Sequence, residues 1–135
     1  MKSEEFKCPS CGDAGKPIDI ITLKSLLNPS ALEQLEAKNE YRFCQSSNCD
    51  VVYFTQNRRL YVKEQIKIPV YQKDNSENTP VCYCFSWTRQ RLSESGKAAI
   101  ANISSHVKAG RCGCEVNNPQ GSCCLGNVTQ FIQQI

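Results

Sequence analysis

Six of the ten cysteines gather in the C-terminal half of the chain, in three closely spaced pairs: Cys82 and Cys84, Cys112 and Cys114, and Cys123 and Cys124. In an extended strand the side chains of Cys82 and Cys84 would point to the same face, so both sulfurs could reach one metal centre. The turn-forming sequence Asn-Pro-Gln-Gly at 118–121 can fold the chain back and bring Cys123 or Cys124 beside Cys114. Two cysteines from a strand and two from a folded-back loop would make a site of four thiolates.

The spacing of these cysteines narrows the choice of metal. Thiolate ligands select zinc, Cu(I) or an iron–sulfur cluster. A single zinc ion usually takes C-x(2–4)-C pairs, whereas Cys82 and Cys84 form a C-x-C pair whose partners lie much further along the chain. Four thiolates that must spread over two irons fit this pattern better, which favours a [2Fe–2S] cluster. On spacing alone, zinc and Cu(I) remain open.

A second set of cysteines near the N-terminus has the spacing of a structural zinc site. Cys8 and Cys11 form a C-x-x-C pair followed by Gly12, which allows a tight turn around a metal. Their expected partners are Cys44 and Cys49, whose spacing is wide but acceptable for zinc. A redox-active C-x-x-C is the rival interpretation, but the βαβ context of such sites is missing here. A closed site of this kind contributes folding energy rather than catalysis.

Several blocks of the sequence resemble known families. The segment V-C-Y-C, followed by Thr88 and a helix, resembles the [2Fe–2S] module of bacterioferritin-associated ferredoxins. The segment C-E-V-N-N-P-Q-G-S-C-C-L-G is more similar to the N-terminal domain of the CopZ copper-chaperone family, and the likeness extends over the N-terminal cysteines and C-D-V-V-Y-F. The resemblance therefore covers nearly the whole chain. It implies one zinc ion and one [2Fe–2S] cluster.

The resemblance also helps to choose among the C-terminal cysteines. Cys82 and Cys84 are the best-supported assignments as cluster ligands. Cys114 is preferred over Cys112 because it matches the C-x-x-x-N-P block of the family. Neighbouring side chains diverge on an extended chain, so only one of the last pair is expected to bind. We favour Cys124, with Cys123 as the alternative. The two cysteines left over could bind Cu(I) or be inert.

The only histidine, His106, lies in a helix-like segment and could be a ligand of a Rieske-type site. Four thiolates suffice, however, and a lone histidine on a polar helix face is usually solvated.

Composition limits the other classes of function. The net charge of +3 is mild and the basic residues are scattered, so no nucleic-acid partner is expected. No apolar run is long enough for a membrane span, and residues 1–5 lack the apolar core of a signal peptide. We therefore expect a cytoplasmic protein whose reduced thiols bind metals. A secreted disulfide framework is the alternative.

The pattern of elements predicts an α+β fold in two parts. Residues 1–72 would form a small zinc-stapled β-rich unit, with strands at 41–44, 51–55 and 60–63 and a helix capped by Ser30 in a capping box with Glu33. Residues 80–135 would form a helical [2Fe–2S]-binding unit, with helices capped by Thr88 and Asn127 on either side of one at 97–109. The polar segment 73–79 would be the linker, or else a surface loop within one domain.

These features predict an electron-transfer protein that supports copper handling, because the resemblance implies reduction of Cu(II) to Cu(I) or transfer of copper to a chaperone or pump. Its partners would be a copper chaperone domain or a copper-transporting ATPase, together with an unidentified electron donor. The M-x-C-x-x-C loop that carries copper is absent from the sequence, so copper transfer would need a separate carrier. The alternative is a protein-interaction module in which both metal sites are structural. An enzyme has little support, since the sequence shows no recognisable catalytic motif.

Overall fold

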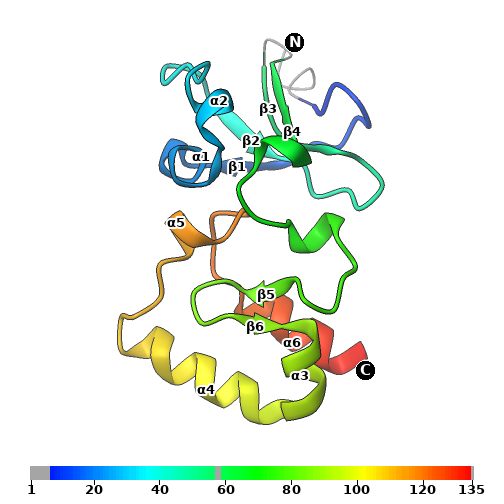
Figure 1. Ribbon diagram of the computed structural model, residues 1–135, viewed down its shortest axis with the longest axis vertical. Helices are drawn as coiled ribbons and strands as arrows, with labels where there is room; N and C mark the ends of the chain where they lie inside the picture. The colour runs from blue at the N-terminus through cyan, green and yellow to red at the C-terminus, as the bar shows by residue number, and fades with distance from the viewer. Residues whose placement is uncertain (1–6, 57–58, 135) are drawn as a thin grey trace.

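The computed structural model describes residues 7–56 and 59–134, whose elements form two groups stacked along the long axis (Figure 1). One group contains a four-stranded antiparallel sheet, made of β1 (Lys16–Ile18), β2 (Tyr41–Phe43), β3 (Val51–Thr55) and β4 (Leu60–Val62). The other contains a two-stranded hairpin with three helices around it. Separate helices and antiparallel strands confirm the predicted α+β class.

The sheet has the order β1-β2-β3-β4, so each strand pairs with its neighbour in sequence. The central strand β3 is buried at all five positions. Val52 and Tyr53 belong to an apolar core with the leucines of α1 (Ile20–Leu26), whereas Val51 and Phe54 pack with the N-terminal cysteines. Both faces of this strand are therefore covered, which explains its continuous run of apolar residues.

The short helix α2 (Pro29–Leu32) begins earlier than the sequence analysis predicted. The capping residue is Asn28, whose Oδ1 accepts a hydrogen bond from the Ala31 N–H at 3.0 Å. The prediction of Ser30 as the N-cap was therefore wrong. Pro29 occupies the first helical position, where its fixed φ and missing N–H carry no penalty.

The hairpin of the second group is formed by β5 (Pro80–Cys82) and β6 (Trp87–Thr88). Cys82 is the last residue of its strand, but Cys84 lies in the tight turn that joins the two strands. The expectation that strand alternation places both sulfurs on one face was therefore wrong. The turn also holds Ser86 at a φ of 57°, a left-handed conformation that is uncommon for a non-glycine residue.

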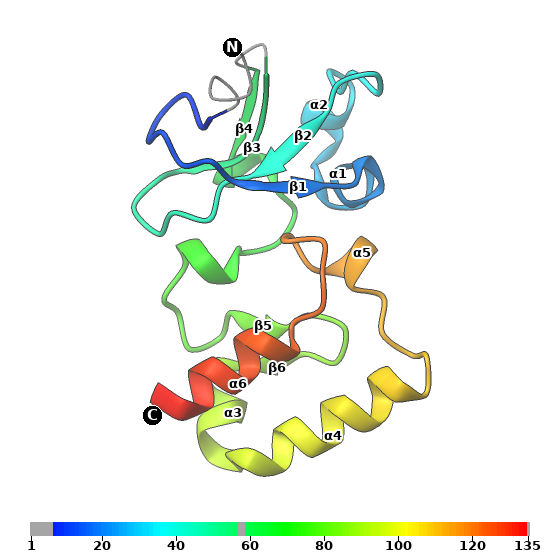
Figure 2. The ribbon, with the colours of Figure 1, turned by 180° about the vertical axis from the view of Figure 1, so that it is seen from behind.

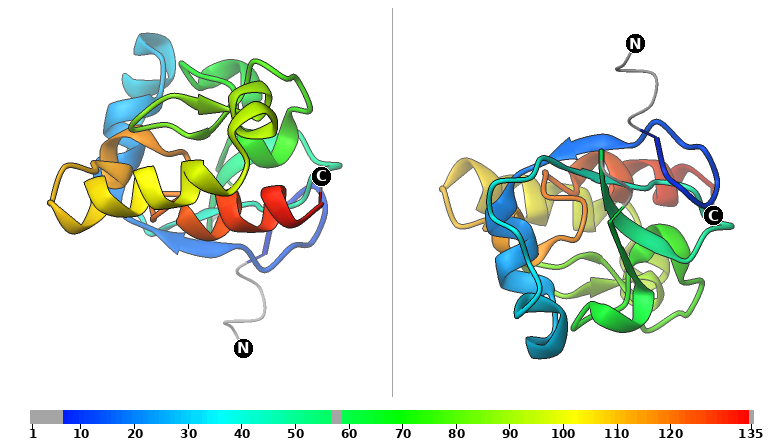
Figure 3. Two further views of the ribbon diagram at one scale, coloured as in Figure 1. Left: turned by 90° about the horizontal axis from the view of Figure 1, so that it is seen from below. Right: turned by 90° about the horizontal axis from the view of Figure 1, so that it is seen from above.

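Three helices surround this hairpin and supply the second core: α3 (Arg89–Ser95), α4 (Lys97–Lys108) and α6 (Leu125–Gln134). The Thr88 hydroxyl accepts a hydrogen bond from the Arg91 N–H at 3.2 Å, which confirms the predicted cap of α3. The last helix starts at Leu125, so Asn127 lies inside it and the prediction of Asn127 as its cap was wrong. Seen from below in Figure 3, α4 and α6 lie together at the end away from the sheet.

The segment that follows α4 runs up to the sheet group and returns to α6, as Figure 2 shows from behind. It contains the one-turn helix α5 (Cys114–Asn117) and the turn at 118–121, closed by a Gly121 N–H to Asn118 carbonyl hydrogen bond of 2.8 Å. Two hydroxyls of the sheet group hold it. Thr22 donates to the Glu115 carbonyl at 2.6 Å, and the buried Tyr53 donates to the Pro119 carbonyl at 2.5 Å.

Across residues 7–56 and 59–134, no helix has the length and apolar character that crossing a bilayer requires.

Candidate metal centres

The first C-x-x-C pair lies on a tight turn before β1. The turn is closed by a hydrogen bond of 2.9 Å from the Gly12 N–H to the Cys8 carbonyl, and Gly12 has a φ of 80°. Because this is a left-handed conformation, glycine is the residue that adopts it at least cost. Cys8 is buried and Cys11 is exposed, so the pair lies at the edge of the folded sheet group.

The second pair is brought to the same place by β2 and β3. Cys44 directly follows β2, and Cys49 lies two residues before β3. The sulfurs of Cys8 and Cys49 are 3.7 Å apart, and those of Cys11 and Cys44 are 3.6 Å apart. All four sulfurs lie within 4.8 Å of one another. The structure thus assembles the four N-terminal cysteines that were expected together.

This spacing fits the dimensions of a zinc ion. With Zn–S bonds of about 2.3 Å, a tetrahedral zinc requires neighbouring sulfurs to be about 3.8 Å apart. The sulfur–sulfur distances of 3.7 Å between Cys8 and Cys49 and 3.6 Å between Cys11 and Cys44 are close to that value. Four thiolates with no open position match a structural zinc site rather than a catalytic one.

Backbone N–H groups point at these sulfurs and favour their charged form. Burial raises the pKa of Cys8, against hydrogen bonds from the N–H groups of Cys11 and Ser10. Burial likewise raises the pKa of Cys44. Burial acts in the same direction on Cys49, yet the pKa of Cys49 is lowered, because the Val51 N–H and the Ser10 hydroxyl donate to its sulfur. Such hydrogen bonds to sulfur stabilise thiolates, which are the form that binds zinc.

The second group of cysteines meets where the β5–β6 hairpin faces α5 and the start of α6. The sulfurs of Cys84 and Cys114 are 3.7 Å apart. The thiol of Cys124 hydrogen-bonds to the sulfurs of Cys82 and Cys114. Cys82, Cys114 and Cys124 are buried, with exposed fractions of 0, 8 and 2%. The turn at 118–121 therefore does bring a late cysteine beside Cys114.

The pKa values of the thiols in this group are shifted in opposite directions. The hydrogen bond from Cys124 lowers the pKa of Cys114 to about 6 and also lowers the pKa of Cys82. Burial raises the pKa of Cys84 to about 11, although its sulfur accepts the Gly113 N–H at 3.1 Å. Thiolates bind metal cations, so the lowered pKa of Cys82 and Cys114 suits this buried group to that role.

The remaining candidates lie at the edge of this group. Cys123 is exposed and Cys112 is half-buried, and both thiols interact with Cys114. The ring of His106 instead stacks on Phe85 at a centroid distance of 4.7 Å, and its Nδ1 lies 3.1 Å from an Arg111 nitrogen.

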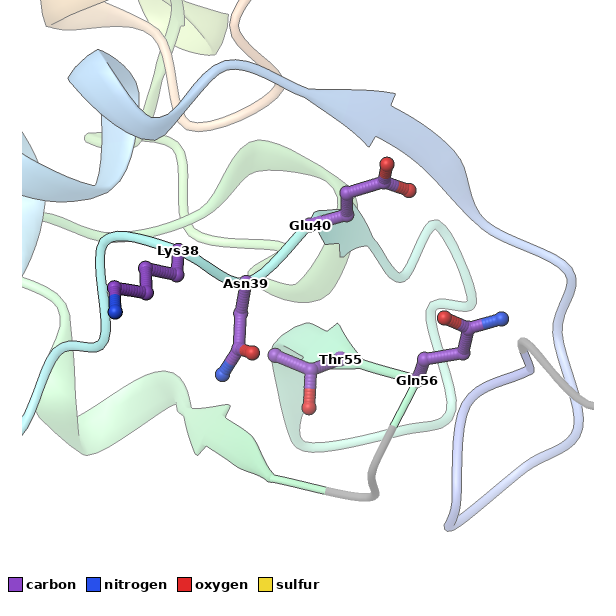
Figure 4. Close-up of a pocket in the computed structure, with 5 residues that line it drawn as sticks. All are labelled: Lys38, Asn39, Glu40, Thr55 and Gln56. Carbon is purple, nitrogen blue, oxygen red and sulfur yellow. The ribbon is translucent and has the colours of Figure 1, made fainter.

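A pocket of about 320 Å³ beside β2 and β3 lies apart from the chemistry of the cysteines (Figure 4). Its lining comes from the segment before β2 and the end of β3: Lys38, Asn39, Glu40, Thr55 and Gln56. No cysteine is among these lining residues, so the pocket does not belong to either metal centre.

Sequence reasoning missed one residue of the zinc site. Lys73, assigned to the polar linker, is buried with an exposed fraction of 8%. Its ammonium donates to the carbonyls of Ser46 and Cys49, at 2.7 and 3.0 Å. A lysine in a run of polar residues carries no local signal of burial, and only the tertiary contact reveals it.

Comparison with known proteins agrees with this geometry. Residues 5–67 match the model of a family described as a zinc binding domain and named after CopZ. The four cysteines that the structure assembles all lie within this matched segment, so the segment is similar to a zinc binding domain at the residues that could hold the metal.

Two relatives extend the likeness beyond the zinc site. The chain is 30% identical over 123 residues to the copper chaperone CopZ of Archaeoglobus fulgidus, an alignment that covers 88% of this chain. The chain spans only 58% of the length of that relative. The X-ray structure of the N-terminal domain of Archaeoglobus fulgidus CopZ is similar with a TM-score of 0.73 and 26% identity, covering 93% of this chain and 96% of that one. The likeness thus includes the region of the second cysteine group.

Proposed function

We propose that this protein is an electron-transfer protein with two metal centres, which supports copper handling. Zinc is held by Cys8, Cys11, Cys44 and Cys49, and a [2Fe–2S] cluster is held by Cys82, Cys84, Cys114 and Cys124. The division into a zinc-binding unit at 1–72 and a cluster-binding unit at 80–135, joined by 73–79, belongs to the same proposal.

The observation that carries the proposal is the meeting of four cysteines from two distant segments. Cys84 and Cys114 are 3.7 Å apart, and Cys124 links Cys82 to Cys114. One of these segments carries a C-x-C pair, and this spacing suits a cluster of two irons better than a single zinc ion.

The residues around this centre would determine how it exchanges electrons. A [2Fe–2S] group, when bound, would supply a store for a single electron. The Gly113 N–H at 3.1 Å and the Asn117 amide at 3.7 Å donate to the Cys84 sulfur and would stabilise added negative charge there. Cys84 is partly exposed while its three partners are buried, so the face around Cys84 is where a redox partner would approach.

The proposed role in copper handling rests on the similarity of this chain to the relative named copper chaperone CopZ. One electron from this centre would convert one Cu(II) to Cu(I), and an external electron donor would restore the reduced protein. The Cu(I) would pass to a copper chaperone domain or a copper-transporting ATPase as the partner.

The test is anaerobic reduction of Cu(II) by the reduced, desalted protein, with Cu(I) measured by a chromogenic chelator. We expect about one Cu(I) per chain from the single-electron centre. The control is Cys82→Ser with its zinc site filled, which retains most other thiols and should yield less Cu(I). Equal yields from both proteins would mean that free thiols reduce copper, and would contradict the proposal.

The assignment of the fourth ligand is tested with two neighbouring variants. Cys124→Ser should lose the visible absorption of the cluster, whereas Cys123→Ser should keep it, because Cys124 is buried and contacts two other ligands. The reverse result would make Cys123 the ligand. If neither wild type nor variant takes up iron, the protein-interaction module with two structural sites becomes the better hypothesis.

A further inference from the structure

Lys73 is a buried cation that contacts the segment from Cys44 to Cys49, here called the zinc knuckle. It lies in a later part of the chain than this segment. It is the last residue of the 3-10 helix η3 (Tyr71–Lys73), and its exposed fraction is 8%. The ammonium donates to the Ser46 carbonyl at 2.7 Å and to the Cys49 carbonyl at 3.0 Å. Burying an ammonium is costly unless charge and hydrogen bonds compensate it, so this position needs a physical reason.

The zinc site supplies the charge that this cation needs. A zinc ion with four thiolates carries a net charge of about −2. The two carbonyls that Lys73 binds belong to Cys49 itself and to Ser46, which lies between the two cysteines of the knuckle. One side chain thus brings a positive charge and two hydrogen bonds to the segment that carries Cys44 and Cys49.

The neighbours of Lys73 in η3 reach the other cysteine group. The Tyr71 N–H donates to the hydroxyl of Tyr83, which lies between Cys82 and Cys84, at 2.8 Å. The Gln72 amide donates to the Gln120 side chain at 2.7 Å, within the turn that precedes Cys123. This helix therefore connects the zinc knuckle to both cysteine-bearing loops of the second centre.

We propose that Lys73 is a positioning residue of the zinc site, which holds the Cys44–Cys49 knuckle in its closed geometry and balances the charge of the thiolates. Through η3, the same residue ties the zinc site to the second cysteine group. The inference rests on zinc occupying the four N-terminal cysteines, as proposed above.

The test is the zinc affinity of Lys73→Met, measured on the full chain by competition with a chromogenic zinc chelator. Losing a residue that orients metal ligands typically weakens metal binding by about 10- to 100-fold, which is the expected effect. The matched control is Lys63→Met. Lys63 is next to the same knuckle through a 3.4 Å ion pair with Asp50, but its side chain is 40% exposed, so a change of less than about fivefold is expected.

The possible results distinguish a failure of the proposed role of Lys73 from a failure of the proposed zinc site. If wild type takes up no zinc, the proposed site fails; if Lys73→Met and Lys63→Met bind zinc equally well, only the role of Lys73 is overturned. Substitution of cadmium for zinc adds a signature at the metal, since the ¹¹³Cd chemical shift should move in Lys73→Met and stay unchanged in Lys63→Met.

A measurement on the wild-type protein covers the case in which Lys73→Met does not fold. In zinc-loaded protein with ¹⁵N-labelled lysine, the ammonium protons of Lys73 should exchange with water much more slowly than those of Lys63. Equal exchange rates would show that Lys73 is not held at the knuckle, and would overturn the proposal.

Discussion

The hydroxyl of Tyr53 gives the sharpest stability prediction, because it joins the sheet to the segment between α4 and α6, which carries four of the C-terminal cysteines. Tyr53 lies in β3 with an exposed fraction of 0%, and its hydroxyl donates to the Pro119 carbonyl at 2.5 Å. Tyr53→Phe removes this donor and leaves the ring, so it creates almost no cavity. The Pro119 carbonyl loses a partner at a buried position.

The size of the effect follows from that unpaired carbonyl. A buried acceptor left without its donor costs about 1–3 kcal/mol. For a chain of this length, roughly 3 °C of melting temperature corresponds to each kcal/mol, so the expected decrease is roughly 3–9 °C. The loop from Pro119 to Cys124 would also be held less firmly, so Tyr53→Phe should lose iron faster than wild type when a chelator is added.

The assay is thermal unfolding followed by circular dichroism, with each variant at the same protein and zinc concentrations because bound metal shifts the melting temperature. The matched control is Tyr61→Phe on the neighbouring strand β4. The Tyr61 hydroxyl is buried without a hydrogen-bond partner among the described residues, so its removal should be neutral or stabilising. Equal melting temperatures for the two variants would refute the reasoning.

Three further predictions concern backbone geometry, capping and metal. Gly121→Ala should lower stability by about 1–3 kcal/mol in denaturant titrations, because the φ of Gly121 is 73° and a Cβ would lie 3.0 Å from the Ile18 side chain. Gly126→Ala is the control: Gly126 lies in helix α6 with open space around it, so this change should raise stability by up to about 1 kcal/mol. A Gly126→Ala protein less stable than the Gly121→Ala protein would contradict this. Thr88→Ala should cost about 1 kcal/mol through loss of the α3 cap, and an unchanged denaturation midpoint would argue against the cap. Removal of zinc by a chelator should unfold the sheet group, since a structural zinc site contributes on the order of 10 kcal/mol; a metal-free protein with an unchanged circular dichroism spectrum would exclude a structural role.

Features fixed by local chemistry could be predicted from the sequence. The β-branched and aromatic run Val51–Thr55 predicted β3 with its observed bounds, and Thr88 predicted the start of α3. The grouping of the N-terminal cysteines followed from the C-x-x-C spacing of Cys8 and Cys11 and the C-x(4)-C spacing of Cys44 and Cys49, because zinc imposes a narrow geometry on its ligands. The cap of α2 was predicted wrongly as Ser30, although Pro29 at the first helical position is a local signal for Asn28.

Features that depend on distant contacts could not be predicted. Strand β1 contains Pro17, which lowers strand propensity, and forms only because the edge of β2 is available for pairing. Lys73 is buried because two carbonyls near the zinc site receive its ammonium, and its own segment gives no sign of this. Cys84 lies in a turn rather than a strand because the β5–β6 hairpin is only a few residues long. The identity of the group bound at the second cysteine set stays a prediction.

The proposed electron-transfer centre is tested most directly by the visible absorption spectrum of anaerobically purified protein, with iron, acid-labile sulfide and zinc assayed on the same sample. A protein with one zinc ion and one [2Fe–2S] cluster should be red-brown, with sulfur-to-iron charge-transfer bands and about two irons, two sulfides and one zinc per chain. Because oxygen can destroy a cluster, a colourless sample is first reconstituted anaerobically with iron and sulfide. A protein that stays colourless after this step, with about two zincs and no labile sulfide, would contradict the central claim of an electron-transfer centre.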